Sequence, residues 1–334
     1  MQHKIERKIN PGLAVVKEGW KGNTVIDGKF HDDATSKGIS FSKVLKWRFS
    51  RKPQRKEKHN DTFRLRAHHF DASSMPENSM VWLGHASFLL NLNDIRLITD
   101  PSFFNLPSGK RKVTLPCPVD SLKPIHYLLI SHDHRDHFDK KSVEALVGNN
   151  PDMEALIPLG GSQLFSGKRL SGVKKQEAGW FQEYNLTDGI RIVFLPAKHW
   201  GRRGLNDTNQ TLWGSFLVIA NHTKIFFAGD SAYDERLFRE IRDLFGDMDI
   251  CLLPIGAYSP QWFMSQAHVN PEEAVQIFSD LGGKRLIPMH YGTYDLSDEP
   301  PGEPIARLRK CSMDKYPDNP VKELMPGEEY LFPV

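Results

Sequence analysis

The pattern of hydrophobic and polar positions changes near residue 80. Before this point, a Gly-rich stretch at 19–28 and a charged run show no sustained helical or strand period. After it, short apolar runs alternate with turn-forming residues, which is typical of strands. We therefore expect an N-terminal extension at 1–79, wrapped on a core or partly disordered, and a single folded domain at 80–334.

The folded part contains two strand-rich stretches, each accompanied by helices. Strands are predicted at the apolar runs 80–83, 87–92, 95–99, 127–131, 190–195, 213–220, 224–228, 249–254 and 286–289. The first three are expected to form an antiparallel meander. Helices are predicted at 139–147, 234–245 and 270–281, where capping residues or glycines mark the ends. A parallel βαβ array would alternate more regularly, so we expect two sheets packed face to face with outer helices.

Composition excludes several classes of protein. With 39% hydrophobic and 10% aromatic residues, the chain has the composition of a globular protein. Its three cysteines, Cys117, Cys251 and Cys311, are odd in number and unpaired in spacing, which argues against a disulfide framework and a thiolate zinc site. No apolar run approaches the roughly 18 residues that span a bilayer. Residues 1–20 lack the continuous apolar core of a secretory signal, so we expect a soluble, cytoplasmic protein.

The net charge of +3 conceals a strongly basic arm at 43–66. Ten Lys or Arg stand there against two acids, so the arm carries +8 and the rest of the chain −5. Trp47, Phe49 and Phe63 are interleaved with these charges. Such a segment suits peripheral contact with an anionic membrane, or contact with a phosphate backbone. The simpler alternative is a solvated, partly flexible arm.

Candidate metal ligands are concentrated in one loop and at three strand ends. The loop 131–137 reads Ser-His-Asp-His-Arg-Asp-His and follows a predicted buried strand. Imidazole and carboxylate groups suit zinc and comparable divalent ions. The alternative is a polar loop without function. That alternative does not explain why three further ligand-type residues follow other predicted strands. The seven candidates are His132, His134, Asp136, His137, His199, Asp230 and His290.

An HxHxDH run followed by a distant His, an Asp and a final His resembles the metallo-β-lactamase superfamily. Further motifs resemble its N-acyl-phosphatidylethanolamine-hydrolysing phospholipase D branch, and they extend from about Met80 to the C-terminus. They include Trp82-Leu-Gly-His85, Leu97-Ile-Thr-Asp100-Pro101, Pro196-Ala-Lys-His199-Trp200, Leu212-Trp-Gly-Ser215, Ile255-Gly-Ala-Tyr258 and His268-Val-Asn-Pro. Arg135 departs from that branch, where an aromatic residue is common, so the accepted head group is expected to differ.

The resemblance implies an α+β fold, a four-layer αβ/βα sandwich with two mixed sheets, and two divalent ions. Zinc is the first expectation, with iron or manganese as alternatives. The implied ligands of one ion are His132, His134 and His199, and those of the other are Asp136, His137 and His290, with Asp230 bridging. The implied reaction is hydrolysis of a phosphodiester, phospholipase D-like on an N-acyl-phosphatidylethanolamine-type lipid, by attack of a metal-bridged hydroxide on phosphorus.

Further residues receive roles from the resemblance. Asp136, Asp230 and His268 are the expected catalytic residues; His268 would protonate the leaving oxygen or bind phosphate, and simple packing is its alternative. Asp100 is expected to accept the second ring N–H of a ligand histidine, or else only to form a turn. His85 would line the site, with a position in the core or in a turn as its alternative. Tyr258, with Trp262, would form an apolar wall for an acyl chain, although core packing is the simpler expectation for Trp262.

Two other functions stay open at this stage. The first is a hydrolase on the same scaffold with another substrate, either a nucleic-acid phosphodiester, a lactone or a sugar phosphate. The second is a non-catalytic protein that binds membranes or nucleic acid and keeps a vestigial metal site, which the seven ligand-type residues disfavour. No obligate protein partner is evident in the sequence.

Overall fold

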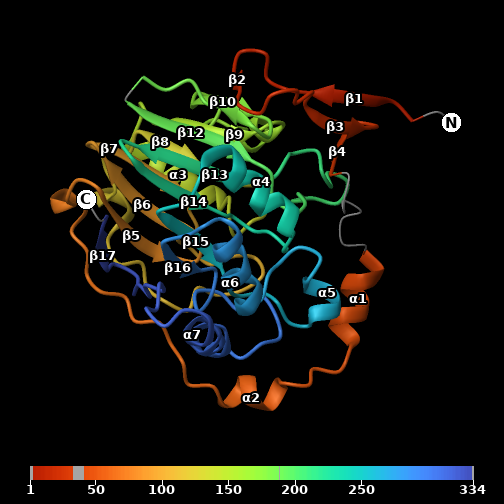
Figure 1. Cartoon of the computed structure of the whole chain (residues 1–334), viewed down its shortest axis with the longest axis vertical. Coiled ribbons are helices and arrows are strands. Elements are labelled where there is room, and N and C mark those ends of the chain that lie inside the picture. Colours follow the sequence, from red (N-terminus) through yellow and green to blue (C-terminus); the bar gives the residue numbers. More distant parts are fainter. Residues whose placement is uncertain (1–2, 33–40, 188, 333–334) are drawn as a thin grey trace.

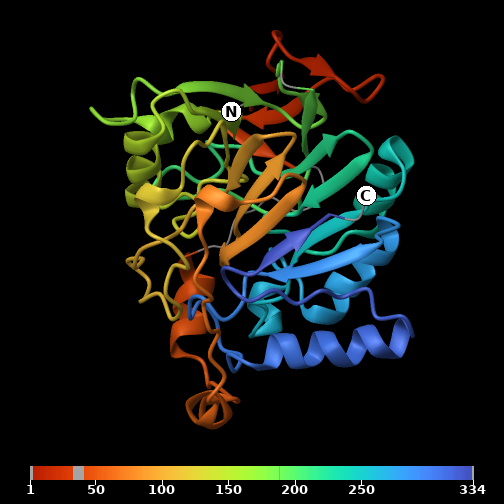
Figure 2. The same cartoon turned by 90° about the vertical axis from the view of Figure 1, so that its left-hand side faces the viewer.

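The computed structural model describes residues 3–32, 41–187 and 189–332. Two seven-stranded β-sheets pack face to face, with helices on the outer sides (Figures 1 and 2). Each sheet contains both parallel and antiparallel strand pairs. The predicted α+β sandwich of two mixed sheets is therefore confirmed.

The first sheet is built mainly from residues 79–178. Its strands are β5 (Ser79–Gly84), β6 (Ser87–Leu92), β7 (Ile95–Thr99), β8 (Tyr127–Leu129), β9 (Glu154–Pro158), β10 (Lys174–Ala178) and β17 (Glu329–Leu331). They lie in the order β10-β9-β8-β7-β6-β5-β17. β5, β6 and β7 pair antiparallel, as the predicted meander requires, and β7 to β10 are parallel.

The second sheet mixes strands in the same way. Its strands are β2 (Ala14–Val15), β11 (Gln182–Glu183), β12 (Ile190–Leu195), β13 (Ser215–Ala220), β14 (Thr223–Phe227), β15 (Ile250–Pro254) and β16 (Arg285–Met289). They lie in the order β16-β15-β14-β13-β12-β11-β2. β14, β15 and β16 are parallel, whereas β12 and β14 both pair antiparallel with β13. β12 and β14 therefore run in the same direction.

Helices cover the outer faces of both sheets. They are α3 (Lys140–Asn149) over the first sheet, and α4 (Glu235–Phe245), α6 (Pro271–Asp280) and α7 (Glu303–Lys315) over the second (Figure 1). Three of them begin at caps visible in the sequence, because Asp139, Asp234 and Asn270 each accept a backbone N–H of the first turn. Helix α7 was not predicted. Within the described residues, no helix has the length and apolar character needed to cross a bilayer.

The N-terminal extension has more regular structure than its sequence predicts. Strands β1 (Ile5–Lys8), β3 (Asn23–Ile26) and β4 (Lys29–His31) form a small sheet, and β2 adds a strand to the second large sheet. The basic arm contains α1 (Phe41–Phe49) and α2 (Arg55–Asn60), separated by a short turn. Residues 1–2 and 33–40 lie outside the described residues, and the division of the chain at residue 79 stays a prediction.

The arm is attached to the folded core rather than free in solvent. The Trp47 ring stacks on Phe263 of the short helix α5 (Gln261–Met264), with 5.1 Å between centroids. Trp47 Nε1 and Lys52 Nζ both donate to Asp298 Oδ2, at 2.8 and 2.9 Å. Accordingly, α1 lies beside α5 in Figure 1. The described part of the arm is therefore packed against the core through Trp47 and Lys52, while most of its residues stay exposed to solvent.

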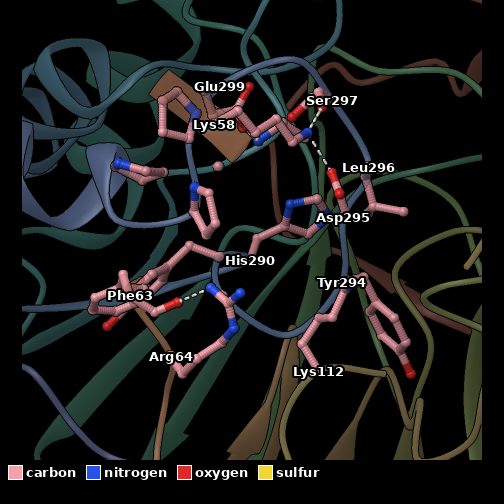
Figure 3. A pocket seen from close by; sticks show the side chains of 17 residues that line it. Lys58, Phe63, Arg64, Lys112, His290, Tyr294, Asp295, Leu296, Ser297 and Glu299 are labelled. Carbon is pink, nitrogen blue, oxygen red and sulfur yellow. Dashed lines mark hydrogen bonds and ion pairs between the residues drawn. The ribbon is translucent and has the colours of Figure 1, made fainter. Parts of the chain in front are cut away.

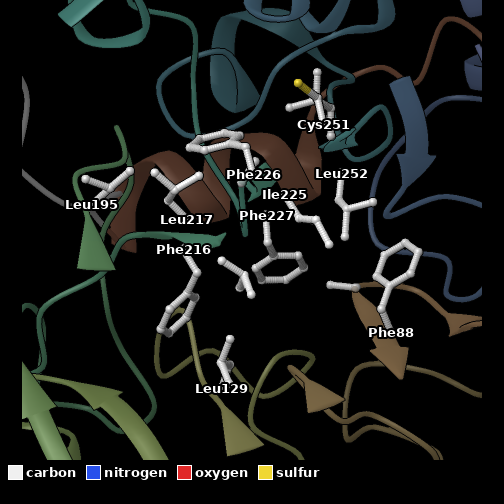
Figure 4. Close-up of a cluster of buried hydrophobic side chains, with 14 of the residues drawn as sticks. Phe88, Leu129, Leu195, Phe216, Leu217, Ile225, Phe226, Phe227, Cys251 and Leu252 are labelled. Atoms are coloured by element: carbon white, nitrogen blue, oxygen red, sulfur yellow. The ribbon is translucent and has the colours of Figure 1, made fainter. Parts of the chain in front are cut away.

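The core lies between the two sheets, where large aromatic side chains interdigitate (Figure 4). Phe88 of β6 and Leu129 of β8 face Phe216 and Phe227 of the second sheet. Leu89, the neighbour of Phe88, points to the opposite face and belongs to the cluster under α3, as strand alternation requires. The strands therefore stay in fixed register, and the polar residues that follow them are held at defined places on one rim.

Candidate metal centre

The candidate ligands follow strands that end at the same rim of the sandwich. The 132–137 loop follows β8, and His199, Asp230 and His290 follow β12, β14 and β16. Gly229 precedes Asp230 with a φ of +58°, and a Cβ there would lie 2.7 Å from the Cβ of Ser131. Only glycine allows this close approach of the two sheets. It brings Asp230 next to the histidines of the loop.

One cluster contains His132, His134, His199 and Asp230. His132 Nε2 lies 3.0 Å from His134 Nδ1, and His199 Nε2 lies 3.1 Å from that same nitrogen. Asp230 Oδ2 lies 4.0 Å from His132 Nε2 and 3.9 Å from His199 Nε2. Tetrahedral zinc, at roughly 2.0–2.1 Å from each nitrogen, separates its ligand atoms by about 3.3 Å. These nitrogens are therefore spaced as ligands of one ion.

A second cluster contains Asp136, His137, His290 and also His85. His137 Nε2 lies 3.2 Å from His290 Nε2, and Asp136 Oδ2 lies 3.6 Å from both nitrogens. His85 Nε2 lies 3.0 Å from Asp136 Oδ2, so the four ligand atoms fall within 4.8 Å of one another. From the sequence, only a lining role is expected for His85. The structure places it among the atoms that could hold an ion.

Asp230 lies between the two clusters. Its Oδ2 is 3.1 Å from His137 Nε2 and its Oδ1 is 3.1 Å from His290 Nε2. Oδ1 nevertheless makes no hydrogen bond with any described residue, although Asp230 is only 2% exposed. A buried, ionised oxygen without a hydrogen-bond donor is costly in free energy unless a cation compensates it. The residues therefore fit divalent metal on both sides of Asp230.

The charge states of the cluster also fit metal binding. Burial alone would raise the pKa of Asp230, but His137, His290 and His268 hold it well below its usual range. Burial and neighbouring imidazoles lower the pKa of His132 and His199. Ionised carboxylates and neutral imidazoles are the forms that bind metal.

Two imidazoles behave differently. Burial disfavours their charged forms, but the nearby Asp230 carboxylate outweighs it: the pKa of His137 is well above its usual range, and that of His290 is about 9. Asp136 adds to both effects. These two rings would release protons when metal binds, because a cation takes over the neutralisation of the carboxylates.

Neighbouring groups orient the candidate ligands. The Asp100 carboxylate accepts from His137 Nδ1 at 2.8 Å and from the backbone N–H and hydroxyl of Ser131 at 2.8 and 2.5 Å. His199 Nδ1 donates to the Ala267 carbonyl at 2.8 Å. Because Nδ1 of both rings carries the hydrogen bond, each Nε2 is left with a lone pair for metal.

Arg203 and Asp133 are functional candidates that sequence reasoning missed. Arg203 Nη1 donates to the carbonyls of Asp133 and Phe138, both at 2.8 Å, and its guanidinium lies 5.2 Å from the Phe138 ring. Asp133 is buried and accepts from the backbone N–H of Arg202 at 2.7 Å. Burial raises the pKa of Asp133 to about 7. Paired arginines in a Gly-rich segment resemble surface charge, so the sequence contained no sign of this contact.

His268 lies at the edge of the cluster. Its Nδ1 is 3.6 Å from Asp230 Oδ2 and is buried without a hydrogen-bond partner in the part of the chain that the structure describes. The side chain keeps 14% of its surface exposed. Burial lowers the pKa of His268, so the ring is neutral at neutral pH. The structure thus brings His268 next to the candidate metal ligands.

The remaining predicted residues lie farther out. Tyr258 packs on α7, where its hydroxyl donates to Glu303 at 2.7 Å and the Arg307 guanidinium lies 4.7 Å from its ring. Trp262 is 43% exposed, so the expectation of core packing is wrong; it lies on the short α5, where Phe263 takes the buried position. Arg135 is exposed and donates to the Arg203 carbonyl.

Two clusters of His and Asp on the rim of an αβ/βα sandwich define a metal-dependent hydrolase. A model of the beta-lactamase superfamily domain matches residues 95–291, and the chain belongs to this superfamily. A solved metallo-hydrolase of the archaeon Ignicoccus hospitalis aligns with a TM-score of 0.56 and 18% identity, over 77% of this chain and 98% of that one. At that identity, the likeness shows the fold alone.

Curated relatives confirm the suspected branch. The chain is 33% identical over 227 residues to N-acyl-phosphatidylethanolamine-hydrolyzing phospholipase D 1 of Caenorhabditis elegans, covering 64% of each chain. It is 32% identical over 237 residues to the mitochondrial enzyme of that name from Saccharomyces cerevisiae, over 68% of this chain and 50% of the relative. The chain therefore spans less than two thirds of the length of either relative.

Proposed function

We propose that the protein is a dinuclear phosphodiesterase that acts, like a phospholipase D, on a lipid of the N-acyl-phosphatidylethanolamine type. The observation that supports this most is the position of Asp230, whose two oxygens each lie 3.1 Å from a histidine of the second cluster. Its Oδ2 also lies 4.0 Å or less from two histidines of the first cluster. A carboxylate so placed suits two ions that share a phosphoryl group. The names of the relatives support the lipid substrate.

The proposed ligands are those implied by the sequence, with zinc as the first candidate metal and iron or manganese as alternatives. His132, His134 and His199 would hold one ion, Asp136, His137 and His290 would hold the other, and Asp230 would contact both. When bound, the ions supply Lewis-acid activation of water and neutralise charge on the phosphoryl group. His85 keeps Asp136 oriented through their 3.0 Å contact.

His268 is proposed to bind the phosphoryl group rather than to protonate the leaving oxygen. Because burial lowers the pKa of His268, its imidazole is neutral near pH 7 and has no second proton to give to the leaving oxygen. A neutral imidazole still donates one N–H, and its placement 3.6 Å from Asp230 leaves it facing the region between the clusters. It would donate a hydrogen bond to a non-bridging phosphate oxygen and so orient the phosphoryl group.

We also propose that the basic arm contacts an anionic lipid surface. Phe49 is 81% exposed and Leu45 39% exposed on α1, among the basic residues of that helix. Lys46 Nζ lies 5.3 Å from the half-exposed Trp262 ring. Exposed apolar side chains beside lysines suit a negatively charged interface. A cytoplasmic location with peripheral membrane contact stays a prediction.

A second candidate substrate is a nucleic-acid phosphodiester. One observation favours it: a shallow depression of about 840 Å³ is formed chiefly by basic side chains of the arm. They are Arg51, Lys52, Arg55, Lys56, Lys58, His59 and Arg64. Such clustered cations attract a phosphate backbone.

A substrate panel tests the proposal. Protein reconstituted with zinc, iron or manganese is assayed on N-acyl-phosphatidylethanolamine, bis(4-nitrophenyl) phosphate, single-stranded RNA and a lactone, with metal counted by elemental analysis. We expect about two ions per chain and release of N-acylethanolamine from the lipid. Turnover of RNA but not lipid would favour the second candidate. Turnover of the lactone alone, or a metal content near zero, would refute the phosphodiesterase proposal.

A further inference from the structure

A cavity of about 130 Å³ lies beside the candidate metal centre, between the basic arm and the loop that follows β16 (Figure 3). His290, a proposed ligand, forms part of its wall. The arm contributes Lys58, Phe63 and Arg64, and the loop after β7 contributes Lys112. None of these four residues belongs to the proposed metal centre.

Part of the cavity wall is apolar. Phe63, Tyr294 and Leu296 line it together with prolines 300, 301 and 304. The Phe63 ring stacks on Tyr291, with 6.4 Å between centroids, which fixes the arm against the loop. A water molecule needs about 10–15 Å³ of such space, so the cavity has room for roughly ten ligand atoms. It suits a head group rather than a long acyl chain.

The acidic residues of the cavity are occupied by internal partners. Glu299 accepts from the backbone N–H groups of Ala257 and Ser259, at 2.7 and 3.0 Å. Asp295 forms an ion pair with Lys58, which also donates to the Ser297 carbonyl (Figure 3). Neither carboxylate is therefore available to a ligand.

Two cations have no such partner. Arg64 donates through Nη1 to the carbonyls of Asp61 and Phe63, and its other N–H groups make no hydrogen bond within the described part of the chain. The Lys112 ammonium makes no hydrogen bond or ion pair among residues 3–32, 41–187 and 189–332. On the wall, His290 Nδ1 is buried without a hydrogen-bond partner.

We propose that this cavity is a subsite for an anionic group on the head group of the substrate, held by Arg64 and Lys112. The inference rests on the proposed function, because it places the scissile phosphodiester at the metal centre next to His290. The metal ions would neutralise the negative charge of the scissile phosphodiester. Arg64 and Lys112 are therefore left to bind a second negative charge on the substrate. A carboxylate a few atoms from the phosphodiester, as in an N-acylated phosphatidylserine, meets this requirement.

The test compares two lipids that differ by one carboxylate. Metal-loaded protein is assayed on N-acyl-phosphatidylserine and N-acyl-phosphatidylethanolamine in neutral detergent micelles, so that surface charge does not favour either. We expect a KM about tenfold lower for the serine lipid, on the scale of a charge-assisted hydrogen bond. The double variant Arg64→Gln/Lys112→Gln should lose this preference and keep its activity on the ethanolamine lipid.

A matched double variant, Arg66→Gln/Lys110→Gln, removes two exposed cations that do not line the cavity. It should keep the preference for the serine lipid. Equal KM values for both lipids in the unmodified protein would overturn the proposal. So would a preference retained by the Arg64/Lys112 variant.

A binding experiment separates failure of the subsite from failure of the proposed function. Calorimetry measures N-acetyl-O-phosphoserine and N-acetyl-O-phosphoethanolamine on the metal-loaded protein, with no turnover required. Tighter binding of the serine compound, lost in the Arg64/Lys112 variant, supports the subsite even if neither lipid is hydrolysed. Equal binding of the two compounds contradicts it, whatever the enzyme assays show.

Discussion

The two sheets contribute to the candidate metal centre in different ways. The first supplies one loop after β8, in which 132–137 contains four candidate ligands. The second supplies a single residue from each of three strand ends, His199, Asp230 and His290. Ligands in one loop depend on that loop keeping its backbone shape, whereas ligands on separate strands depend on the register of the sheet. The two halves should therefore respond to different kinds of damage.

The supports of the two halves differ accordingly. The loop is held by side chains from elsewhere, because Asp100 binds His137 and Arg203 binds the loop carbonyls. The strand ends are held by close backbone packing: a Cβ on Gly256 would lie 2.3 Å from the carbonyl oxygen of His290. Side-chain variants can weaken the loop without unfolding it. Among the ligands at the strand ends, Asp230 is the one to substitute, because it lies between both clusters.

Replacement of that shared ligand, Asp230→Asn, should have the largest effect. The amide keeps the shape of the carboxylate but removes the negative charge that faces both clusters. We expect kcat/KM for bis(4-nitrophenyl) phosphate to fall by about a hundredfold or more. Metal content should fall below two ions per chain.

The fold is the control for this variant. The circular dichroism spectrum should change little, since the amide keeps the shape of the carboxylate. The melting temperature of metal-free protein should fall, because the carboxylate lies 3.1 Å from His137 and from His290 and raises the pKa of both rings. Activity and metal content equal to those of the unmodified protein would contradict a bridging role for Asp230.

Much of this architecture was predictable from sequence. The bounds predicted from apolar runs match those of β6, β7 and β12 at both ends, because turn-forming residues flank each run. The candidate ligands could be predicted because they are polar residues that directly follow buried strands. Burying a His or Asp side chain costs free energy unless a partner or a metal ion compensates it.

Other elements left no local pattern. Strand β10 (Lys174–Ala178) is mostly polar and was missed; its pairing with β9 is a tertiary contact. The arm shows no periodic pattern in the sequence, because Trp47 packs on Phe263, a residue far along the chain. His85 and Arg203 were undervalued for the same reason: only the fold brings them to Asp136 and the loop carbonyls.

Asp100→Asn tests the support of the loop from the first sheet. Asp100 accepts from His137 Nδ1, and an amide in its place would allow that ring to change tautomer or rotate. We expect activity or metal affinity to fall between about ten- and a hundredfold. Isotope-labelled histidine spectra of the zinc form should show the changed tautomer. An unaltered tautomer with full activity would leave Asp100 as a turn residue only.

Arg203→Ala tests the second support, with an expected loss of about tenfold in kcat/KM. The guanidinium binds two loop carbonyls and stacks on Phe138, so its removal should loosen the loop without touching a ligand. Arg203→Lys should recover only part of the loss, because an ammonium lacks the planar fork. Arg202→Ala is the matched control, since among the described residues the Arg202 side chain donates only to the Gly204 and Leu205 carbonyls. Equal effects of the alanine variants at 202 and 203 would argue against this support.

His268→Gln should have the smallest effect, because glutamine also donates an N–H to a phosphate oxygen. Burial lowers the pKa of His268. The ring therefore loses its second proton at a lower pH than an ordinary histidine and is already neutral at pH 7. A hydrogen-bonding role therefore predicts a change in kcat within about threefold and a pH profile of unchanged shape above pH 7. If His268 instead protonated the leaving oxygen, the glutamine variant would lose the alkaline limb of the profile. His268→Ala, which has no donor, should raise KM more than the glutamine variant does, and equal KM values would remove His268 from phosphate binding.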